Sequence, residues 1–318
     1  MMAKKVFITG GSGYFGTQLC LEMEKLDWVE AVDFIDVKKP IYKFQKAKFK
    51  LMDINDPALS DWLSQIKPDI VIHLAYVLEE IHDKNLMFKI NVLGTENLLK
   101  ACAQAKVPQI LVASSATAYG AYPDNPIPLK EHHPLNPNPD FIYAFHKKIL
   151  EQLCQDYLKE HPETCLSIIR PCVVYGPNVN NYLSDLLDLT ILPIIRAHHP
   201  PLQFIHQHDL IRAILTIIQA KANGAFNLAP DDTLTIMDIV QRAKKPYISL
   251  PLSVAKIGVG LLWNLRIPRA RFSPGFLNYF AYPWIVDSSK IQSELGFKFL
   301  YSSKETIEIM LRIKKIIP

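Results

Sequence analysis

The chain has 318 residues, of which 49% are hydrophobic, and a formal net charge of +4. That length can bury a large core, and the modest charge comes from basic residues spread along the chain, which argues against nucleic acid as a partner. Five cysteines without metal-ligand spacing, and no room for a signal peptide before the first apolar run, predict reduced thiols, no metal site and a cytoplasmic location.

Short apolar runs typical of strands alternate with helical patterns up to about residue 174, which predicts an α/β fold with a doubly wound parallel sheet. The strands are expected at Lys5–Thr9, Ala31–Ile35, Phe49–Met52, Ile70–Leu74, Ile110–Ala113 and Leu166–Ile169. Two long helices are expected at Asn85–Gln104 and Phe141–Glu160.

A glycine-rich turn, Thr-Gly-Gly-Ser-Gly-Tyr-Phe-Gly at residues 9–16, joins the first strand to a helical pattern. Dinucleotide binding requires this setting, because glycines let the backbone approach a pyrophosphate and the helix N-terminus supplies N–H groups to it. Asp36 ends the second strand twenty residues after Gly16, where a carboxylate accepts hydrogen bonds from ribose hydroxyls and repels a 2′-phosphate. NAD is therefore expected in preference to NADP, although Lys38 and Lys39 nearby would favour a phosphate.

These patterns divide the chain into two expected domains. Residues 1–176 would form a Rossmann domain that binds the dinucleotide, with strand and helix pieces near 202–228 returning to it. Residues 177–318 would mainly form a smaller C-terminal α/β lobe that binds the substrate.

Tyr143 and Lys147 stand four residues apart in the second long helix, which places both side chains on one face. A lysine ammonium beside a phenol lowers the tyrosine pKa and provides a proton donor near neutral pH. The same spacing is common on solvated helix faces, so the pair alone leaves both interpretations open. The glycine turn and the serines that end the fifth strand, at residues 113–115, favour the catalytic one.

Taken in chain order, these segments resemble the extended short-chain dehydrogenases/reductases of the NAD-dependent epimerase/dehydratase group. The matching segments are Thr9–Gly16, Asp53-Ile54, His73-Leu74-Ala75, Asn91–Thr95, Ser114–Gly120, Tyr143–Lys147, Arg170–Pro177, Phe204–Leu210 and Glu294–Phe297. They cover nearly the whole chain and are jointly specific for the family, but not for its substrate.

The resemblance assigns roles to individual residues. In the family, the triad hydroxyl stands four positions before a Tyr-Gly pair, which here is Ser115 before Tyr119. Ser115 would hydrogen-bond the reacting oxygen, Tyr143 would move its proton, and Lys147 would lower the Tyr143 pKa and bind the nicotinamide ribose. The expected cofactor-binding residues are Gly10, Gly13, Tyr14, Phe15, Gly16, Asp36, Asp53, Ile54, Leu74, Ala75, Asn91, Tyr143, Lys147 and Pro171. Substrate contacts are expected from Thr117, Asn178 and Arg271.

Two departures from the family pattern narrow the expected reaction. The dehydratases carry Asp-Glu directly after the triad hydroxyl, whereas Ala116 and Thr117 stand here, so dehydration is not expected. Many nucleotide-sugar epimerases place an arginine four residues before the His of the segment matching Phe204-Ile-His206, and this chain has Leu202 there. Without this arginine, we expect weaker binding of a substrate diphosphate. Arginines that could replace it are Arg196, Arg269 and Arg271.

The segment Leu250–Trp263 is unusually apolar but is shorter than the ~20 residues of a membrane span and carries Lys256. We expect a buried or lobe-lining helix, and a further interpretation is that it lines a pocket for an apolar substrate. No membrane span is expected.

The preferred functional interpretation is an NAD-dependent epimerase that acts on a nucleotide-sugar-like small molecule by hydride transfer with Ser-Tyr-Lys catalysis. The alternative is a dehydrogenase or reductase of an apolar alcohol or ketone, of the hydroxysteroid-dehydrogenase sort. A non-catalytic regulator that binds the cofactor is a minor third interpretation. A homodimer is left open.

Overall fold

The computed structural model describes residues 3–177, 179, 182–267 and 272–317. Within these residues, one parallel sheet has seven strands in the order β10-β6-β5-β4-β1-β2-β3. The strands are β1 (Lys4–Thr9), β2 (Val29–Asp36), β3 (Ala47–Leu51), β4 (Ile70–His73), β5 (Gln109–Ala113), β6 (Cys165–Pro171) and β10 (Gly224–Leu228). The order reverses beside β1, which is the switch point where doubly wound sheets bind ligands. The predicted fold class is confirmed.

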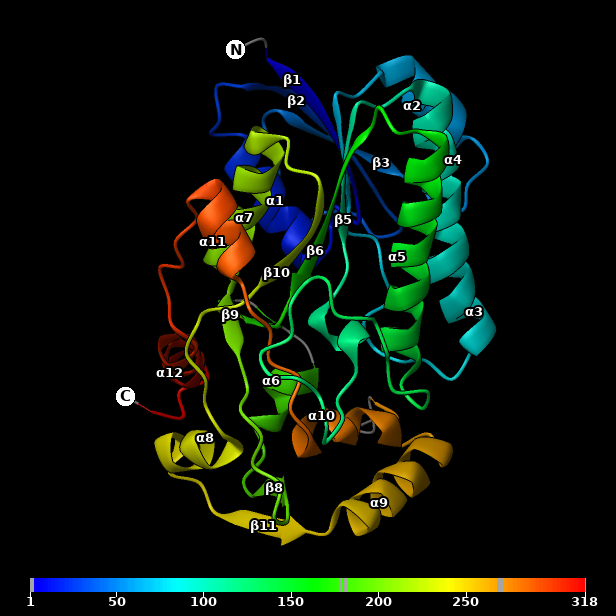
Figure 1. Ribbon diagram of the computed structural model, residues 1–318. Helices are drawn as coiled ribbons and strands as arrows, with labels where there is room; N and C mark the ends of the chain where they lie inside the picture. The colour runs from blue at the N-terminus through cyan, green and yellow to red at the C-terminus, as the bar shows by residue number, and fades with distance from the viewer. Residues whose placement is uncertain (1–2, 178, 180–181, 268–271, 318) are drawn as a thin grey trace.

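Helices cover both faces of the sheet (Figure 1). Helices α1 (Tyr14–Met23), α7 (Gln207–Ala220) and α11 (Ser289–Leu295) lie on one face, and α2 (Leu59–Ile66), α4 (Gly94–Ala105) and α5 (Ile142–Glu160) lie on the other. Strand β1 contributes side chains to the hydrophobic cores on both faces of the sheet, because successive strand side chains point to opposite faces. Ile8 packs in one core with Leu19, whereas Phe7 packs in the other with Leu98.

Each expected strand overlaps an observed one, and the helix expected at Phe141–Glu160 is α5. The helix expected at Asn85–Gln104 forms as α3 (Lys84–Phe88), a π-helical segment (Lys89–Leu93) and α4 in succession. Strand β10, late in the chain, pairs with β6 in the main sheet. The division into two domains near residue 176 stays a prediction.

Beyond the carboxyl ends of the sheet strands lies a smaller lobe, in the lower half of Figure 1. Its strands pair in parallel, β7 (Val173–Tyr175) with β9 (Phe204–His206) and β8 (Leu192–Ile195) with β11 (Tyr247–Leu250). Its helices are α6 (Tyr182–Leu186), α8 (Ile236–Ala243), α9 (Leu252–Asn264), a 3₁₀ turn (Pro274–Leu277), α10 (Asn278–Ala281) and α12 (Ser303–Ile313). Helices α8 and α12 both begin with a capping box, which satisfies backbone N–H groups of their first turns.

Candidate active site

The glycine turn has no room for side chains. Gly10 has a φ of +75°, and a Cβ atom there would lie 2.7 Å from the backbone nitrogen of Ala75. A Cβ atom on Gly16 would lie 2.2 Å from the carbonyl oxygen of Gly10. The backbone of the turn therefore packs against itself and against the end of β4, and it exposes main-chain atoms where a pyrophosphate can approach.

The turn also carries hydrogen-bonding groups that fit a phosphate-bearing ligand. Helix α1 begins after Gly13, which has no side chain to cap the first N–H groups. The Ser12 hydroxyl is buried and has no hydrogen-bond partner among the described atoms. The Ser12 N–H donates to the Asp36 carboxylate at 3.1 Å, and the Lys38 N–H donates to its other oxygen at 2.9 Å. Asp36 thus lies beside the turn, as the sequence predicts for a ribose acceptor.

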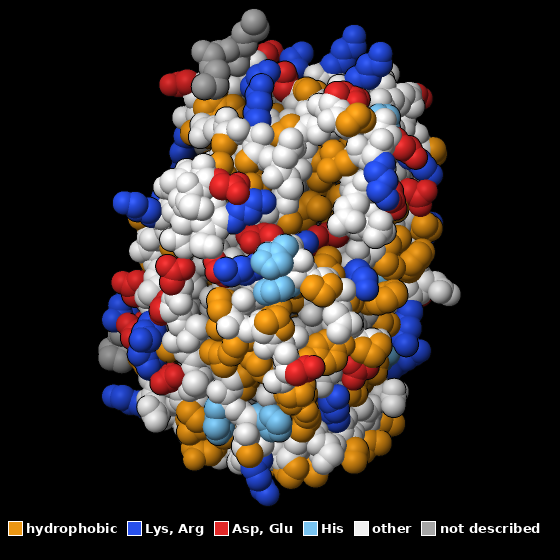
Figure 2. Space-filling view, in the orientation of Figure 1, with side chains coloured by type: hydrophobic (Ala, Val, Ile, Leu, Met, Phe, Trp, Pro, Cys, Tyr) orange, Lys and Arg blue, Asp and Glu red, His pale blue; other side chains and the backbone are white. Residues whose placement is uncertain are grey.

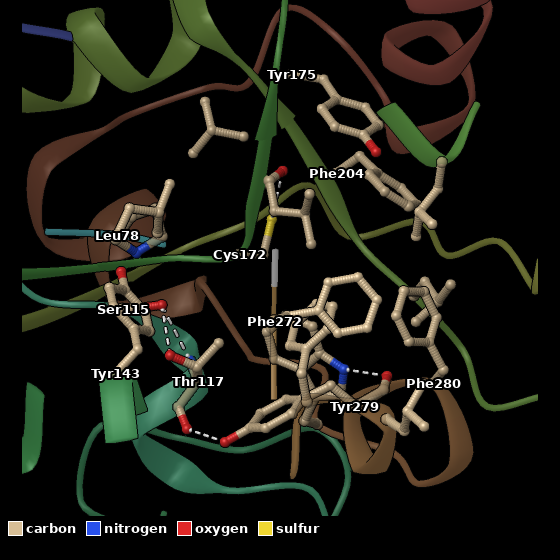
Figure 3. Close-up of a pocket in the computed structure, with 18 of the residues that line it drawn as sticks. Leu78, Ser115, Thr117, Tyr143, Cys172, Tyr175, Phe204, Phe272, Tyr279 and Phe280 are labelled. Carbon is tan, nitrogen blue, oxygen red and sulfur yellow. Dashed lines mark hydrogen bonds between the residues drawn. The ribbon is translucent and has the colours of Figure 1, made fainter. Parts of the chain in front are cut away.

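The structure brings the three predicted catalytic residues together. Ser115 follows β5 and begins the 3₁₀ helix Ala116–Tyr119, while Tyr143 and Lys147 lie in the first turns of α5. Tyr143 is hydrogen-bonded to Ser115. Thr117 joins them, because its hydroxyl donates to the Ser115 hydroxyl oxygen at 2.9 Å (Figure 3).

The electrostatics of the pair differ from the sequence expectation. Burial raises the pKa of Tyr143, and hydrogen bonding to Ser115 only partly opposes this. Lys147 instead donates to the carbonyl oxygen of Ala113 at 2.6 Å and lies 3.3 Å from the ring centroid of Tyr76. Its nitrogen is 5.7 Å from the Tyr143 ring centroid. The expected lowering of the Tyr143 pKa by Lys147 is therefore not found.

Burial also changes the charge of the lysine itself. Removal from water lowers the pKa of Lys147 to about 7, against the attraction of the Glu151 carboxylate. A group with that pKa exchanges a proton near neutral pH, which suits a proton relay.

A buried ion pair holds α5 against the sheet behind the catalytic residues. The Arg170 guanidinium on β6 donates to the Glu151 carboxylate on α5 at 2.6 Å, and the side chains are 5% and 1% exposed. Glu151 also accepts from the Ser114 hydroxyl at 2.5 Å, and Arg170 donates to the Tyr119 hydroxyl at 2.5 Å. The network joins the helix that carries Tyr143 to the strand end that carries Ser115.

Asn91, which is an expected cofactor contact, has its side-chain amide bound to the backbone in the structure. Its side-chain oxygen accepts from the Val77 N–H at 2.7 Å and its amide donates to the Val77 carbonyl oxygen at 3.1 Å. Asn91 is buried and does not line the cavity described below. Both ends of its amide are used to hold the loop after β4, so it positions that loop.

A cavity of about 660 Å³ runs from the glycine turn past Tyr143 into the lobe. Aliphatic and aromatic side chains dominate its lobe end, where Tyr175, Phe204, Phe272 and Phe280 are among the lining residues (Figure 3). Leu202, at the position of the missing arginine, is among the lining residues. Of the described residues that line the cavity, Lys147 is the single charged one.

Helix α9 forms one wall of this cavity, as expected for a lobe-lining helix, through residues that include Val254, Ala255, Val259 and Leu262. None of its residues is buried, however, so the expectation of a buried helix is wrong. Its other side faces away from the lobe.

Apart from Asn91, the predicted site residues fall into three groups. Those that line the cavity are Gly10, Gly13, Tyr14, Phe15, Gly16, Leu74, Ser115, Thr117, Tyr143, Lys147 and Pro171. Asp36, Asp53, Ile54 and Ala75 do not line it, but they lie at the carboxyl ends of β2, β3 and β4, on the edge of the sheet that carries the glycine turn. Asn178 and Arg271 lie outside the described residues, as does Arg269.

Two residues of the site were missed by the sequence analysis. Tyr76 directly follows the His-Leu-Ala motif and packs edge-on against Tyr143, with ring centroids 5.6 Å apart. Buried Glu80 accepts from the N–H groups of Ile142, at the start of α5, and Ser273, at 2.7 and 2.9 Å. The position of Tyr76 beside a motif could have signalled it, whereas nothing local indicates that Glu80 joins segments so far apart.

Comparisons with known proteins agree with this geometry. An uncharacterized protein of Mycobacterium tuberculosis (strain ATCC 25618 / H37Rv) is 23% identical over 99% of this chain and 85% of its own length. UDP-glucose 4-epimerase 2 of Arabidopsis thaliana is 30% identical over 58% of this chain and 56% of its own length. The solved structure of UDP-glucuronic acid 4-epimerase from Bacillus cereus in complex with NAD has a TM-score of 0.76 and 20% identity, over 98% of this chain and 99% of that one. MoeE5 in complex with UDP-glucuronic acid and NAD has a TM-score of 0.77 and 21% identity, with the same coverage.

The model of the NAD dependent epimerase/dehydratase family matches residues 6–229. That range holds the glycine turn, Asp36, the Ser115–Tyr143–Lys147 group and the Arg170–Glu151 pair. The chain belongs to the NAD-dependent epimerase/dehydratase family.

Proposed function

We propose that this protein is an NAD-dependent oxidoreductase that interconverts a secondary alcohol and a ketone on a largely apolar substrate. The substrate class is inferred from the cavity lining, in which Lys147 is the single charged side chain among the described residues. A nucleotide diphosphate would need cationic or amide partners in the lobe, because a buried charge without a partner is costly.

Several features support NAD as the cofactor. The glycine turn, the uncapped start of α1 and the unpaired Ser12 hydroxyl fit a pyrophosphate, and Asp36 fits the adenosine ribose. Solved structures of similar fold carry NAD. Bound by these residues, NAD would supply the hydride transfer that interconverts a secondary alcohol and a ketone.

Residues of the chain would transfer the proton of the substrate hydroxyl. The Ser115 hydroxyl, oriented by Thr117, hydrogen-bonds the substrate oxygen and holds it beside the Tyr143 hydroxyl. On oxidation Tyr143 takes the alcohol proton while its own hydroxyl proton passes on, and on reduction both transfers reverse. Lys147, whose pKa is about 7, lies between the Ala113 carbonyl and the rings of Tyr76 and Tyr143, where it can bind a ribose hydroxyl and pass on the proton.

A second candidate is the epimerisation of a nucleotide sugar. The names of the similar proteins favour it, as does the Ser115-Ala-Thr-Ala-Tyr119 segment. The lobe does not favour this candidate, because Leu202 stands where an arginine would bind the diphosphate. Arg196, which could replace that arginine, instead donates through its guanidinium to the carbonyl oxygen of Ser249.

The two candidates differ in how they handle the cofactor. An epimerase must keep NADH and the keto intermediate bound until the hydride returns, whereas a dehydrogenase exchanges its cofactor in every cycle. The test measures absorbance and fluorescence of the purified protein, followed by addition of UDP-glucose or of an alicyclic secondary alcohol, with and without NAD. We expect NADH to accumulate only with the alcohol and added NAD. Epimerisation of UDP-glucose without added NAD would establish the second candidate instead.

Asp36 provides a separate test of the cofactor. Titration should show tighter binding of NAD than of NADP, because the carboxylate repels a 2′-phosphate. Tighter NADP binding would assign the role to Lys38 or Lys39.

A homodimer is part of the proposal. Leu86, Phe88, Leu93 and Phe145 are exposed on α3, α5 and the π-helical segment, where a second copy would cover them. Native mass measurement of the wild type and of Leu93→Gln tests this contact.

A further inference from the structure

Helix α9 is apolar on the side that faces away from the cavity as well as on the side that lines it. Ile257 and Leu261 are 65% and 59% exposed, and Leu265, just past the helix end, is 70% exposed. Their spacing of four places them in one stripe along the helix. A helix that is apolar on opposite sides is normally covered on both, and the described part of the chain does not cover this stripe.

The exposed surface continues onto the neighbouring strand. Tyr247 and Ile248 on β11 are exposed, and so is Ile191, which precedes β8, the strand paired with β11. We call the surface formed by Ile191, Tyr247, Ile248, Ile257, Leu261 and Leu265 the apolar end. Strands β8 and β11 and helix α9 form the lower end of the molecule in Figure 1, where Figure 2 shows hydrophobic side chains gathered.

Basic residues outnumber acidic ones in the segment that carries most of the apolar end. From Ile239 to Val286 the sequence contains no Asp or Glu but seven Lys and Arg residues. Of these, Lys244 and Arg266 are exposed, and Lys256 is half-exposed with the Asp140 carboxylate 3.5 Å away. An apolar surface with basic residues around it is complementary to anionic lipid headgroups over acyl chains.

We propose that the apolar end docks on the surface of an anionic lipid bilayer, with α9 lying in the plane of the interface. The helix has 13 residues, fewer than the ~20 that cross a bilayer, and no described helix is long and apolar enough to span one. The docking goes beyond the proposed function and does not require it. If the proposed function also holds, α9 separates the bilayer from the cavity, so an apolar substrate passes from lipid to the site without crossing water.

Vesicle flotation tests the docking. The wild type should float with phosphatidylcholine vesicles that contain phosphatidylglycerol, and less with phosphatidylcholine alone. Ile257→Gln combined with Leu261→Gln should lower the binding at least ~tenfold, because two side chains lose their transfer into the apolar layer. The matched control is Leu300→Gln combined with Ile313→Gln, which alters side chains that are 58% and 43% exposed beside and on α12. This control should float like the wild type.

Two further variants separate the possible outcomes. Lys244→Gln combined with Arg266→Gln leaves the stripe intact and should weaken binding only to the vesicles with phosphatidylglycerol. Tyr143→Phe should dock like the wild type, so failure of catalysis and failure of docking can be told apart. NAD binding by each variant confirms that it is folded.

Three results would overturn the proposal. The wild type could fail to float with either vesicle, or the Ile257 and Leu261 variant could float equally well. A native mass showing a dimer that this variant dissociates would assign the apolar end to a second copy instead of a bilayer.

Discussion

A methyl group added to Gly16, in the glycine turn, would lie 2.2 Å from a backbone oxygen, whereas one added to Gly258, on α9, would meet no atom within 4 Å. These two glycines illustrate a difference between the two ends of the cavity. At the cofactor end, backbone contacts and buried polar bonds define nearly every position. At the lobe end, aliphatic and aromatic side chains meet mainly through non-directional contacts, for which size matters more than identity.

The difference has a consequence for how function can vary. Replacing either partner of a buried ion pair such as Arg170–Glu151 destabilises the fold, because the other charge is left buried without a counter-charge. A lining residue such as Leu202 can be exchanged for another side chain of similar volume at small cost. We therefore expect the cofactor half to constrain the reaction and the lobe to be the part in which substrate preference can change.

The largest expected effect tests the catalytic end. Tyr143→Phe should lower turnover ~10²–10⁴-fold and leave NAD affinity nearly unchanged, because only the transferable proton is lost. The matched control is Tyr76→Phe, since that ring lies 5.6 Å from the Tyr143 ring and its hydroxyl has no partner among the described atoms. Steady-state rates on an identified substrate compare the two variants. If the control lost as much activity as Tyr143→Phe, the proton donor would have to be reassigned.

The buried ion pair should dominate stability. Glu151→Gln should lower the free energy of unfolding by ~3–5 kcal/mol, because it leaves the Arg170 guanidinium buried without its counter-charge. Glu96→Gln is the control, since that carboxylate pairs with Lys100 at 2.6 Å on an exposed helix face and should contribute ~0–1 kcal/mol. Urea unfolding compares the two variants. Equal losses would contradict the contrast between buried and exposed pairs.

A pH-dependent loss of stability is expected from His73. Burial lowers its pKa to about 3, and its ring nitrogens are bonded to the hydroxyls of Thr9 and Thr95 at 2.7 and 2.9 Å. In the unfolded chain its pKa would be about 6.5, so the unfolded state binds the proton first and stability falls as pH drops from about 6.5 towards 3. At about pH 5 the loss should reach ~2 kcal/mol.

Urea unfolding across this pH range measures the effect. His73→Asn should be less stable at neutral pH and should reduce the pH dependence, of which burial of His146, with a pKa of about 4, supplies another part. His132→Gln, at an exposed position, should leave the dependence unchanged. A dependence that stays as steep in His73→Asn would assign it to another group.

The same contrast explains which features the sequence predicted. The nearness of the glycine turn, Asp36 and Ser115 was predictable because they stand at strand ends, which converge at one edge of a parallel sheet. The spacing of Tyr143 and Lys147 predicted that these two share one face of α5. The hydrogen bonding of Asn91 was not predictable, because the motif that contains it does not show that its side-chain amide binds the backbone of Val77. Glu80 and Ser273 lie 193 positions apart, so only the folded chain shows that they meet.

Burial is the other quantity that the sequence does not supply. The spacing of Tyr143 and Lys147 predicts that they share a helix face, but not that Lys147 donates to Ala113 or that burial raises the pKa of Tyr143. The apolar composition of α9 likewise indicates a lobe helix but not that its outer stripe stays exposed. In both cases the deciding contacts come from segments distant in sequence.

The smallest expected effect uses one substitution at both ends of the cavity. Gly258→Ala should raise the free energy of unfolding by ~0.5–1 kcal/mol, because alanine favours the helix and the added methyl group meets no atom within 4 Å. Gly16→Ala should lower it by ~1–3 kcal/mol, since the methyl group must displace the backbone of Gly10 and Gly11. It should also abolish NAD binding, whereas Gly258→Ala should not change it. Thermal unfolding with and without NAD measures both variants, and a loss of stability in Gly258→Ala would mean that the lobe end is packed as tightly as the glycine turn.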